Sequence, residues 1–233
     1  ATEAWLRINN QPAPLALRAN RLRTTGTALA ESLAACGVQL EPGRFAPDAW
    51  IVRKGNPLLT PLADTGVFVV QDEASQLVAS LVSARAGERV LDACASPGGK
   101  TTAIAAAMGD RGLIVATDVR GRRVDLLART VRASGAQSVK IVQADASALP
   151  LRAAFDWILL DAPCSGLGTL RRDPDVRWRR SESDLPRLAA SQRQMLEETA
   201  RALAPGGRLV YSTCSSEPEE DEDVVAAFVA SGA

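Results

Sequence analysis

The stretch Arg89-Val-Leu-Asp92-Ala-Cys-Ala-Ser-Pro-Gly-Gly-Lys100-Thr-Thr102 decides the fold of this chain of 233 residues. Its apolar pair Val90-Leu91 predicts a short buried strand, and a helical pattern follows over 100–108. Between them, Gly98 and Gly99 let the backbone approach a ligand closely, while the helix start offers free amide donors and a partial positive charge. A ligand that carries a carboxylate suits such a turn. The spacing matches neither G-x-x-x-x-G-K-[ST] nor G-x-G-x-x-G, so ATP is a less favoured ligand.

From Arg89 onward, short apolar runs alternate with longer helical patterns, which is typical of a parallel sheet built from right-handed crossover units. The predicted strands lie at 90–91, 113–116, 139–142, 157–160 and 209–211. Helical patterns occupy 100–108, 120–134 and 184–203, and a further helix is expected to pack on the sheet at 72–84. We therefore expect a Rossmann-like α/β domain.

The first 70 residues differ in character and suggest a small N-terminal α+β module. We expect a strand at 15–18, a helix at 27–36 and a strand at 49–52, followed by a boundary rich in proline and glycine. The expected domains are 1–70 and 71–233. Because the chain begins without a methionine and stops directly after a helical pattern, we also expect that both of its ends are truncated.

Composition limits the functional classes. A chain with 46% hydrophobic residues can bury a sizeable core, and its formal net charge of zero argues against a protein held on nucleic acid by global charge, although local basic patches are present. Four cysteines without a disulfide-like framework suggest a reducing compartment. No stretch approaches the roughly 20 apolar residues of a membrane helix and no signal-peptide pattern opens the chain, so we expect a cytoplasmic location.

Three carboxylates follow predicted strands. Asp118 ends the second strand, where it can accept hydrogen bonds from ribose hydroxyls, and Asp145 and Asp161 follow the third and fourth strands. Each of them taken alone could be a helix cap or a solvated turn residue. Because the carboxyl ends of parallel strands meet at one edge of a sheet, we expect the three to converge on the glycine turn.

Two cysteines also lie just past apolar strands, Cys164 after Ile158-Leu-Leu160 and Cys214 after Leu209-Val-Tyr211. Free cysteine is usually a small buried hydrophobe, but these two lie beyond their strands, so we expect both thiols in one crevice as groups for chemistry. For Cys36 and Cys94 we expect only a structural role, as small hydrophobic residues. The chain has no histidine, so a cysteine–histidine pair is excluded.

In these motifs the chain resembles the RNA cytosine-5 methyltransferases that use S-adenosylmethionine, in particular the bacterial small-subunit ribosomal RNA methyltransferase B group. The resemblance spans nearly the whole chain. Its most specific pieces are Asp92 to Thr101, Asp161-Ala-Pro-Cys-Ser-Gly166, Arg171-Arg-Asp-Pro-Asp-Val-Arg-Trp178 and Ser212-Thr-Cys-Ser215, with weaker matches at Gln71-Asp-Glu-Ala-Ser-Gln76 and Leu17-Arg-Ala-Asn20. Such proteins usually carry an RNA-binding domain upstream and a further strand pair downstream, and neither lies within this chain.

The resemblance implies a Rossmann-like methyltransferase domain and a reaction in which a thiolate adds to C6 of cytosine, C5 takes the methyl group, and the thiol is eliminated. Cys214 is similar to the family's nucleophile and Cys164 to the second thiol, which assists release of the methylated base. Asp161 is similar to the acid between cofactor and cytosine. A nucleophilic Cys214 needs a lowered pKa or a local base.

By the same resemblance, S-adenosylmethionine is the cofactor, with Asp118 at its ribose, Asp145 near its adenine and Asp161 beside it. The segment that would line its methionine and sugar consists of Cys94, Ala95, Ser96, Pro97, Gly98, Gly99 and Lys100. No metal is implied. The expected partner is RNA, in particular ribosomal RNA, and its target base must be single-stranded or flipped out, because a base inside a duplex cannot reach such a pocket.

A basic stretch after the first cysteine motif predicts an RNA-backbone and stacking surface, since arginine binds phosphates bidentately and an aromatic face stacks on a base. Its members are Arg171, Arg172, Arg177, Trp178, Arg179 and Arg180. The alternative is a solvated loop with one packed tryptophan. We expect Arg18, Arg21 and Arg23 to extend the surface into the small module, and the acidic run 217–223 to begin the last helix.

Other functions compete with an RNA cytosine-5 methyltransferase. A small-molecule methyltransferase would share the glycine turn but leaves the paired cysteines and the arginines unexplained. A non-catalytic RNA-binding scaffold would hold S-adenosylmethionine only as a structural ligand. A DNA cytosine methyltransferase is less favoured, because those enzymes place the nucleophile in the first motif and lack this second cysteine.

Overall fold

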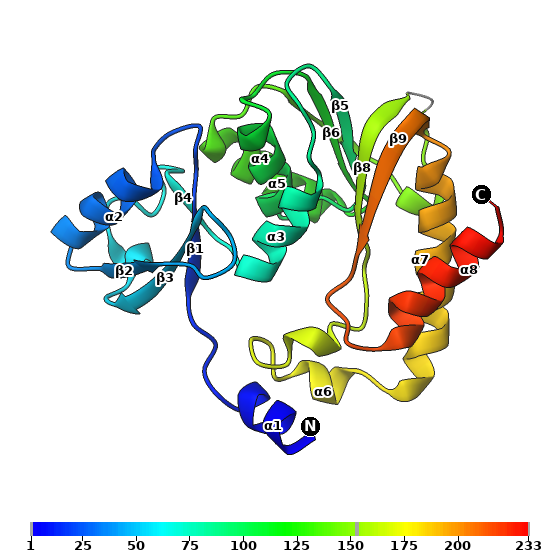
Figure 1. The fold of residues 1–233 in the computed structure, drawn as a ribbon, viewed down its shortest axis with the longest axis horizontal. Helices are drawn as coiled ribbons and strands as arrows, with labels where there is room; N and C mark the ends of the chain where they lie inside the picture. The colour runs from blue at the N-terminus through cyan, green and yellow to red at the C-terminus, as the bar shows by residue number, and fades with distance from the viewer. Residues whose placement is uncertain (1, 152–153, 233) are drawn as a thin grey trace.

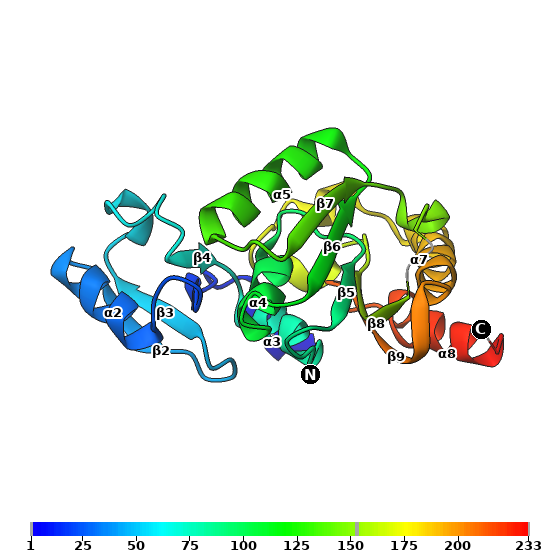
Figure 2. The ribbon, with the colours of Figure 1, turned by 90° about the horizontal axis from the view of Figure 1, so that it is seen from above.

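The computed structural model describes residues 2–151 and 154–232, which form two sheets (Figure 1). The larger sheet has five parallel strands in the order β7-β6-β5-β8-β9, seen side by side in Figure 2. Its strands are β5 (Arg89–Asp92), β6 (Leu113–Asp118), β7 (Val139–Gln143), β8 (Phe155–Asp161) and β9 (Leu203–Ser212). All five predicted strands and the Rossmann-like fold class are confirmed.

Helices cover both faces of this sheet (Figure 1). One face carries α3 (Glu73–Leu81), α4 (Gly99–Ala107) and α5 (Gly121–Ser134), and the other carries α7 (Leu185–Ala200) and α8 (Glu222–Ala230). Apolar side chains of the strands alternate between the two cores: Val90 packs toward the first helix layer and Leu91 toward the second. Within the described part of the chain, no helix is both long and apolar enough to cross a bilayer.

The strand order creates a crevice at the carboxyl ends of the strands. From β5 the chain moves outward through β6 to β7, and it then returns to the other side of β5 to form β8 and β9. At such a reversal the loops after the neighbouring strands diverge, and ligands of open α/β sheets bind there. The loops after β5 and β8 carry the glycine turn and the first cysteine motif, respectively.

The small module is an antiparallel sheet in the order β2-β3-β1-β4, with one helix packed on it. Its elements are β1 (Ala16–Ala19), α2 (Gly26–Ala35), β2 (Gln39–Pro42), β3 (Ala49–Lys54) and β4 (Phe68–Val70), and α1 (Thr2–Asn9) precedes them. The predicted strands at 15–18 and 49–52 and the predicted helix at 27–36 are confirmed. The division of the chain into 1–70 and 71–233 stays a prediction.

Polar groups join the small module to the larger domain. Arg18, only 3% exposed, donates from Nε to Oε1 of Gln71 at 2.7 Å and from Nη2 to Oγ1 of Thr102 at 2.8 Å. Asn20 donates from Nδ2 to the carbonyl oxygens of Gly66 and Ser134, at 2.7 and 2.9 Å. The prediction that Arg18 extends an RNA surface is therefore wrong, since its guanidinium lies inside this junction.

Candidate active site

The two strand-end cysteines lie in contact. Strands β8 and β9 pair in parallel, with Asp161 opposite Ser212, so the segments that follow them leave the sheet side by side. This brings Sγ of Cys164 to 3.1 Å from Sγ of Cys214, and the Cys214 amide donates to the Cys164 sulfur at 3.2 Å. Cys214 is exposed and Cys164 is half-buried. The crevice thus holds two adjacent thiols, one of them open to a substrate.

The contact shifts the pKa values of the two thiols in opposite directions. The pKa of Cys214 lies below its usual value, chiefly because the Cys164 thiol donates a hydrogen bond to its sulfur; Lys100 contributes, while burial and Asp161 oppose the effect. The same hydrogen bond, together with burial, raises the pKa of Cys164. Of the two sulfurs, Cys214 is therefore the one favoured as thiolate, without any histidine.

Asp161, at the end of β8, lies beside this pair with both carboxylate oxygens engaged. Ser212 donates from Oγ to Oδ1 at 2.8 Å, and Nζ of Lys100, on the first turn of α4, lies 2.6 Å from Oδ2. Asp161 therefore connects the cysteine strand β9 to the helix that follows the glycine turn. The sequence placed Lys100 in the cofactor segment but contained no signal for this ion pair.

The glycine turn passes into α4 through Gly98, the N-cap residue, at a φ of +106°. A Cβ atom there would lie 2.9 Å from Cδ1 of Leu127, so glycine is required both by the backbone conformation and by the close approach of α5. The turn borders a cavity of about 360 Å³, called here the loop cavity. Among its lining residues are Asp92, Cys94, Ala95, Ser96, Pro97, Gly99, Lys100 and Asp161.

A second cavity of about 470 Å³, called here the central cavity, brings together all three strand-end carboxylates, Asp118, Asp145 and Asp161. Asp118 is buried and its Oδ2 lies 3.0 Å from Nε of Arg123. Asp145 caps the following turn, and hydrogen bonds from Ser147 lower its pKa. Cys164 and Cys214 line the same cavity. The expected convergence of the carboxylates and thiols is thus what the fold produces.

Asp92 ends the strand before the glycine turn, and the sequence pattern alone does not mark it as a site residue. It is 1% exposed; its Oδ2 accepts a hydrogen bond from Oγ1 of Thr101 at 2.6 Å, and its buried Oδ1 has no partner among the described residues. Burial raises the pKa of Asp92 to about 7. Such an unsatisfied carboxylate oxygen in the loop cavity suits a ligand with a positive charge or a hydrogen-bond donor. Its burial depends on tertiary packing, which the sequence pattern does not display.

A third cavity of about 670 Å³, called here the outer cavity, lies on the other side of the thiols. It shares Asp161 and Cys214 with the central cavity, and Lys100 also lines it. Arg171 and Arg172 contribute to its wall. Two molecules bound in the central and outer cavities would therefore meet at Asp161 and Cys214, which is the arrangement that a transfer reaction requires.

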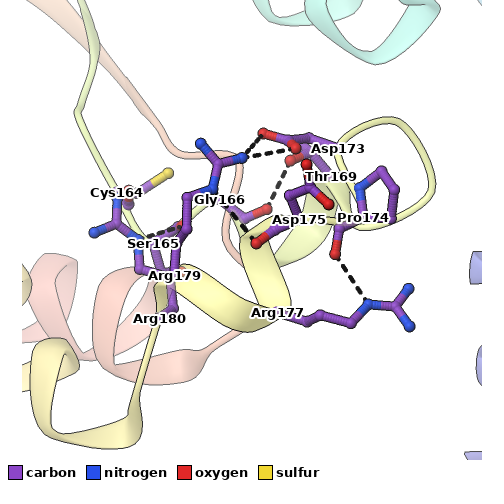
Figure 3. A network of polar contacts seen from close by, with 10 residues as sticks. All are labelled: Cys164, Ser165, Gly166, Thr169, Asp173, Pro174, Asp175, Arg177, Arg179 and Arg180. Carbon is purple, nitrogen blue, oxygen red and sulfur yellow. Dashed lines mark hydrogen bonds and ion pairs between the residues drawn. The ribbon is translucent and has the colours of Figure 1, made fainter.

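Most of the arginines predicted to bind RNA make contacts within the chain, and Figure 3 shows those of Arg177, Arg179 and Arg180. Arg171 donates to the carbonyl oxygens of Gln11 and Pro12, Arg172 pairs with Asp72, Arg179 pairs with Asp173, and Arg180 donates to the carbonyl oxygen of Ser165. On the short helix α6 (Val176–Arg179), Arg177 contacts only the Pro174 carbonyl among the described residues, and Trp178 is 83% exposed. Five of the six predicted residues, all but Arg171, are nevertheless exposed, and Arg177 and Trp178 are the least engaged within the chain. The RNA-binding surface stays a prediction.

Residues 79–232 match the family described as 16S rRNA methyltransferase RsmB/F, and residues 1–58 match the ferredoxin-like domain found in the same proteins. The chain belongs to the RsmB/F family of 16S rRNA methyltransferases. The expected resemblance is thereby confirmed, with the F group added to the B group.

Among its relatives in this RsmB/F family, the ribosomal RNA small subunit methyltransferase B of Sodalis glossinidius is 38% identical over 227 residues, covering 95% of this chain and 52% of that protein. The ribosomal RNA small subunit methyltransferase F of Escherichia coli O81 is 36% identical over 231 residues, covering 94% of this chain and 48% of that protein. The chain thus spans about half the length of the curated relatives it matches.

Solved structures share the fold. A methyltransferase homologue from Pyrococcus horikoshii is 31% identical and has a TM-score of 0.86, with 96% of this chain and 72% of that chain covered. The protein PH0851 is 33% identical with a TM-score of 0.94, with 99% of this chain and 53% of that chain covered. The RsmB/F chain therefore has the backbone arrangement of these proteins across both of its sheets.

Proposed function

We propose that this chain transfers a methyl group from S-adenosylmethionine to C5 of a cytosine in RNA, with small-subunit ribosomal RNA as the substrate. The observation that carries the proposal is the contact between the Cys164 and Cys214 thiols at the boundary of two cavities, beside Asp161. Family membership gives the substrate class, since the matched family consists of 16S rRNA methyltransferases.

In the proposed reaction Cys214 is the nucleophile. Its thiolate adds to C6 of the cytosine, so that a C6–S bond forms and electron density moves to C5, which takes the methyl group. The C5 proton then passes to solvent, the electrons of the C5–H bond form the C5=C6 bond, and the C6–S bond breaks to return the Cys214 thiolate. Cys164, which keeps its proton, is proposed to assist this release by its hydrogen bond to the departing sulfur, 3.1 Å away.

Asp161 is proposed to hold the cytosine between cofactor and thiol. Its carboxylate lines the loop, central and outer cavities, and it is fixed by Ser212 and Lys100. Because both of its carboxylate oxygens have partners, Asp161 keeps one orientation as the substrate enters, which favours a fixed position of the cytosine for methyl transfer.

The chain's residues fit S-adenosylmethionine. Asp118 and Asp145 are proposed at its ribose and adenine, and Cys94, Ala95, Ser96, Pro97, Gly98, Gly99 and Lys100 along its methionine and sugar. The unpartnered oxygen of buried Asp92 supplies an acceptor for its ammonium group, and the carboxylates suit its positive charge. When bound, this cofactor supplies a methyl group on a sulfonium.

The proposal also assigns roles to the two parts of the chain. The module 1–70 is proposed to bind RNA, and 71–233 is proposed to be the catalytic domain. The proposed location is the cytoplasm, where ribosomal RNA is found.

The test is methyl transfer from labelled S-adenosylmethionine to unmodified small-subunit ribosomal RNA. We expect label at cytosine C5 with the unmutated chain and a loss of at least about a thousandfold in Cys214→Ala, because the substitution removes the proposed nucleophile. Cys164→Ala is expected to accumulate a covalent RNA–protein adduct, seen as a band that survives denaturing electrophoresis. Cys36→Ala removes an exposed thiol outside the crevice and is the matched control.

Two results would overturn parts of this proposal. An adduct that persists in Cys214→Ala but is lost in Cys164→Ala would exchange the roles of the two thiols. Binding of S-adenosylmethionine without transfer to any RNA would favour a small-molecule methyltransferase or a non-catalytic scaffold instead.

A further inference from the structure

Glu220 is a carboxylate buried at the back of the thiol crevice. It is 0% exposed and lies in the turn Pro218–Glu220 that precedes α8. Its Oε1 accepts hydrogen bonds from the amide of Ser165 and from Nε2 of Gln192, both at 2.8 Å. Burial raises the pKa of Glu220, but the donors of Ser165 and Gln192, with Ser215 nearby, outweigh this effect and leave the pKa below its usual value. Oε1 accepts both hydrogen bonds, while the buried Oε2 has no hydrogen-bond partner among the described residues.

Through these donors Glu220 holds the segment that carries Cys164, called here the Cys164 loop (162–166). Ser165, whose amide binds the carboxylate, is the next residue after Cys164. Gln192 uses the same Nε2 atom to donate to the carbonyl oxygen of Pro163 at 3.0 Å, just before the cysteine. The main chain is thus fixed on both sides of Cys164, and Glu220 is common to both contacts.

The turn that carries Glu220 also holds the segment of Cys214, called here the Cys214 loop (213–216). Tyr211 donates from its hydroxyl to the Glu220 carbonyl oxygen at 2.7 Å. The next residue, Asp221, accepts a hydrogen bond from Oγ1 of Thr213 at 2.5 Å. Directly between the two loops, the hydroxyls of Ser165 and Ser215 lie 3.1 Å apart. The acidic turn therefore contacts both thiol loops at the residues adjacent to the cysteines.

We propose that Glu220 is a positioning residue, which fixes the Cys164 loop against the Cys214 loop and thereby sets the contact between the two thiols. It acts through the backbone of Ser165 and touches neither sulfur. The inference deepens the proposed function, on which it rests for the roles of the thiols. A residue in the acidic run thus serves the site, in addition to the predicted start of the last helix, α8 at Glu222.

The experiment measures the contact without RNA or cofactor. Alkylation of Cys214 by iodoacetamide is followed against pH, with the Cys214 peptide quantified by mass spectrometry. In Glu220→Ala, loss of the thiol contact removes a hydrogen bond to the charged sulfur, so we expect the apparent pKa of Cys214 to rise by about one unit. Glu220→Gln keeps an acceptor oxygen for Ser165 and is expected to stay close to the unmutated profile. Glu219→Ala, an exposed acid in the same turn, is the matched control and is expected to cause no shift.

The charged or titratable groups that face the thiols, Asp161, Lys100, Arg180 and Tyr211, are unchanged in all these variants. Coincident profiles for Glu220→Ala and the unmutated chain would overturn the positioning role, as would an equal shift in Glu219→Ala. If Glu220→Ala does not fold, Glu220→Asp, which withdraws the carboxylate by one methylene, is assessed by the same criterion. An unmutated chain that never methylates RNA would contradict the proposed function and leave this result intact.

Discussion

At the scale of single residues, the acids of the crevice differ because their surroundings differ. Asp92 makes no ion pair among the described residues and is enclosed by apolar strands, so burial dominates and its pKa rises to about 7. Asp145 lies near the surface, where hydrogen bonds from Ser147 dominate and its pKa falls. Two carboxylates at strand ends of the same sheet can therefore carry different charges near neutral pH, which is a property of active sites.

The buried Asp92 should make stability depend on pH. Between about pH 4 and 7 the folded chain retains a proton at Asp92 that the unfolded chain has lost, so the free energy of unfolding falls as pH rises through this window. A shift of about three pKa units corresponds to at most about 4 kcal/mol. Asp92→Asn has no such proton, and its stability should fall less than that of the unmutated chain. Urea unfolding at pH 5, 6, 7 and 8 measures the difference, and parallel curves would contradict the prediction.

At the scale of elements, α6 presents the open part of the arginine segment. In Figure 3 the Arg177 side chain extends away from the cluster formed by Arg179, Arg180 and their partners. Trp178, on the same helix, is 83% exposed, although large aromatic side chains normally bury most of their surface. The two side chains together offer a stacking face and a phosphate contact on one turn of helix.

Replacing Trp178 by alanine should weaken RNA binding, because base stacking on an aromatic side chain contributes about 1–3 kcal/mol. We expect a roughly 5- to 150-fold higher Kd for single-stranded RNA at fixed salt concentration. Leu81→Ala is the matched control, since Leu81 is 61% exposed on α3, outside the small module. Fluorescence anisotropy with a labelled RNA measures both variants, and an equal effect of the two would argue against a stacking role for α6.

Sequence patterns predicted the sheet and the convergence of its strand ends for a physical reason. Runs such as Ile158-Leu-Leu160 are apolar on both faces, which only a strand covered on two sides requires, and parallel strands bring their ends to one edge. Elements without such runs escaped prediction. Strand β2 is mostly exposed, and α1 leaves Trp5 and Ile8 about half exposed, so neither has a continuous buried pattern.

The sequence predicted which residues belong to the site better than it predicted the contacts between them. Cys164, Cys214 and Asp161 were identified by their places after strands, and the structure brings them together. Arg18 was misplaced because a charged residue in a strand normally faces solvent, whereas here the opposite module covers it. Glu220 was hidden in an acidic run whose other members begin a helix. Contacts of this kind depend on how distant segments pack, and no local pattern encodes them.

At the scale of the whole molecule, the junction between the two sheets binds the small module to the cofactor side of the crevice. Arg18 reaches the carbonyl oxygen of Gly99 at 3.1 Å, on the first turn of α4. Although burial lowers the pKa of Arg18 to about 10, the guanidinium keeps its charge at neutral pH. A displacement of the small module would therefore move Arg18 and disturb its hydrogen bond at the glycine turn.

Gly66 lies close to the backbone of α5 in this junction, and a mutation there tests the packing. Gly66 has a φ of +74°, and a Cβ atom would lie 1.9 Å from the Ala133 carbonyl oxygen. Gly37 has a similar φ of +78° with nothing within 4 Å, so Gly37→Ala reports the backbone strain alone. We expect Gly66→Ala to lose roughly 1–3 kcal/mol more than Gly37→Ala, because overpacking adds to the strain. Denaturant unfolding of both variants measures this excess. An equal loss in the free energy of unfolding would mean that the junction accommodates the added methyl group without cost.

Strand β9 lies at the edge of the large sheet and pairs only with β8 among the described residues, yet it leads into the Cys214 loop. Edge segments open locally at a smaller free energy than central ones. In this stretch of 233 residues, warming should therefore separate the two thiols while most of the sheet is still intact. The temperature up to which the thiol contact survives would then be set by one ladder of hydrogen bonds, and the midpoint of global unfolding would overstate that temperature.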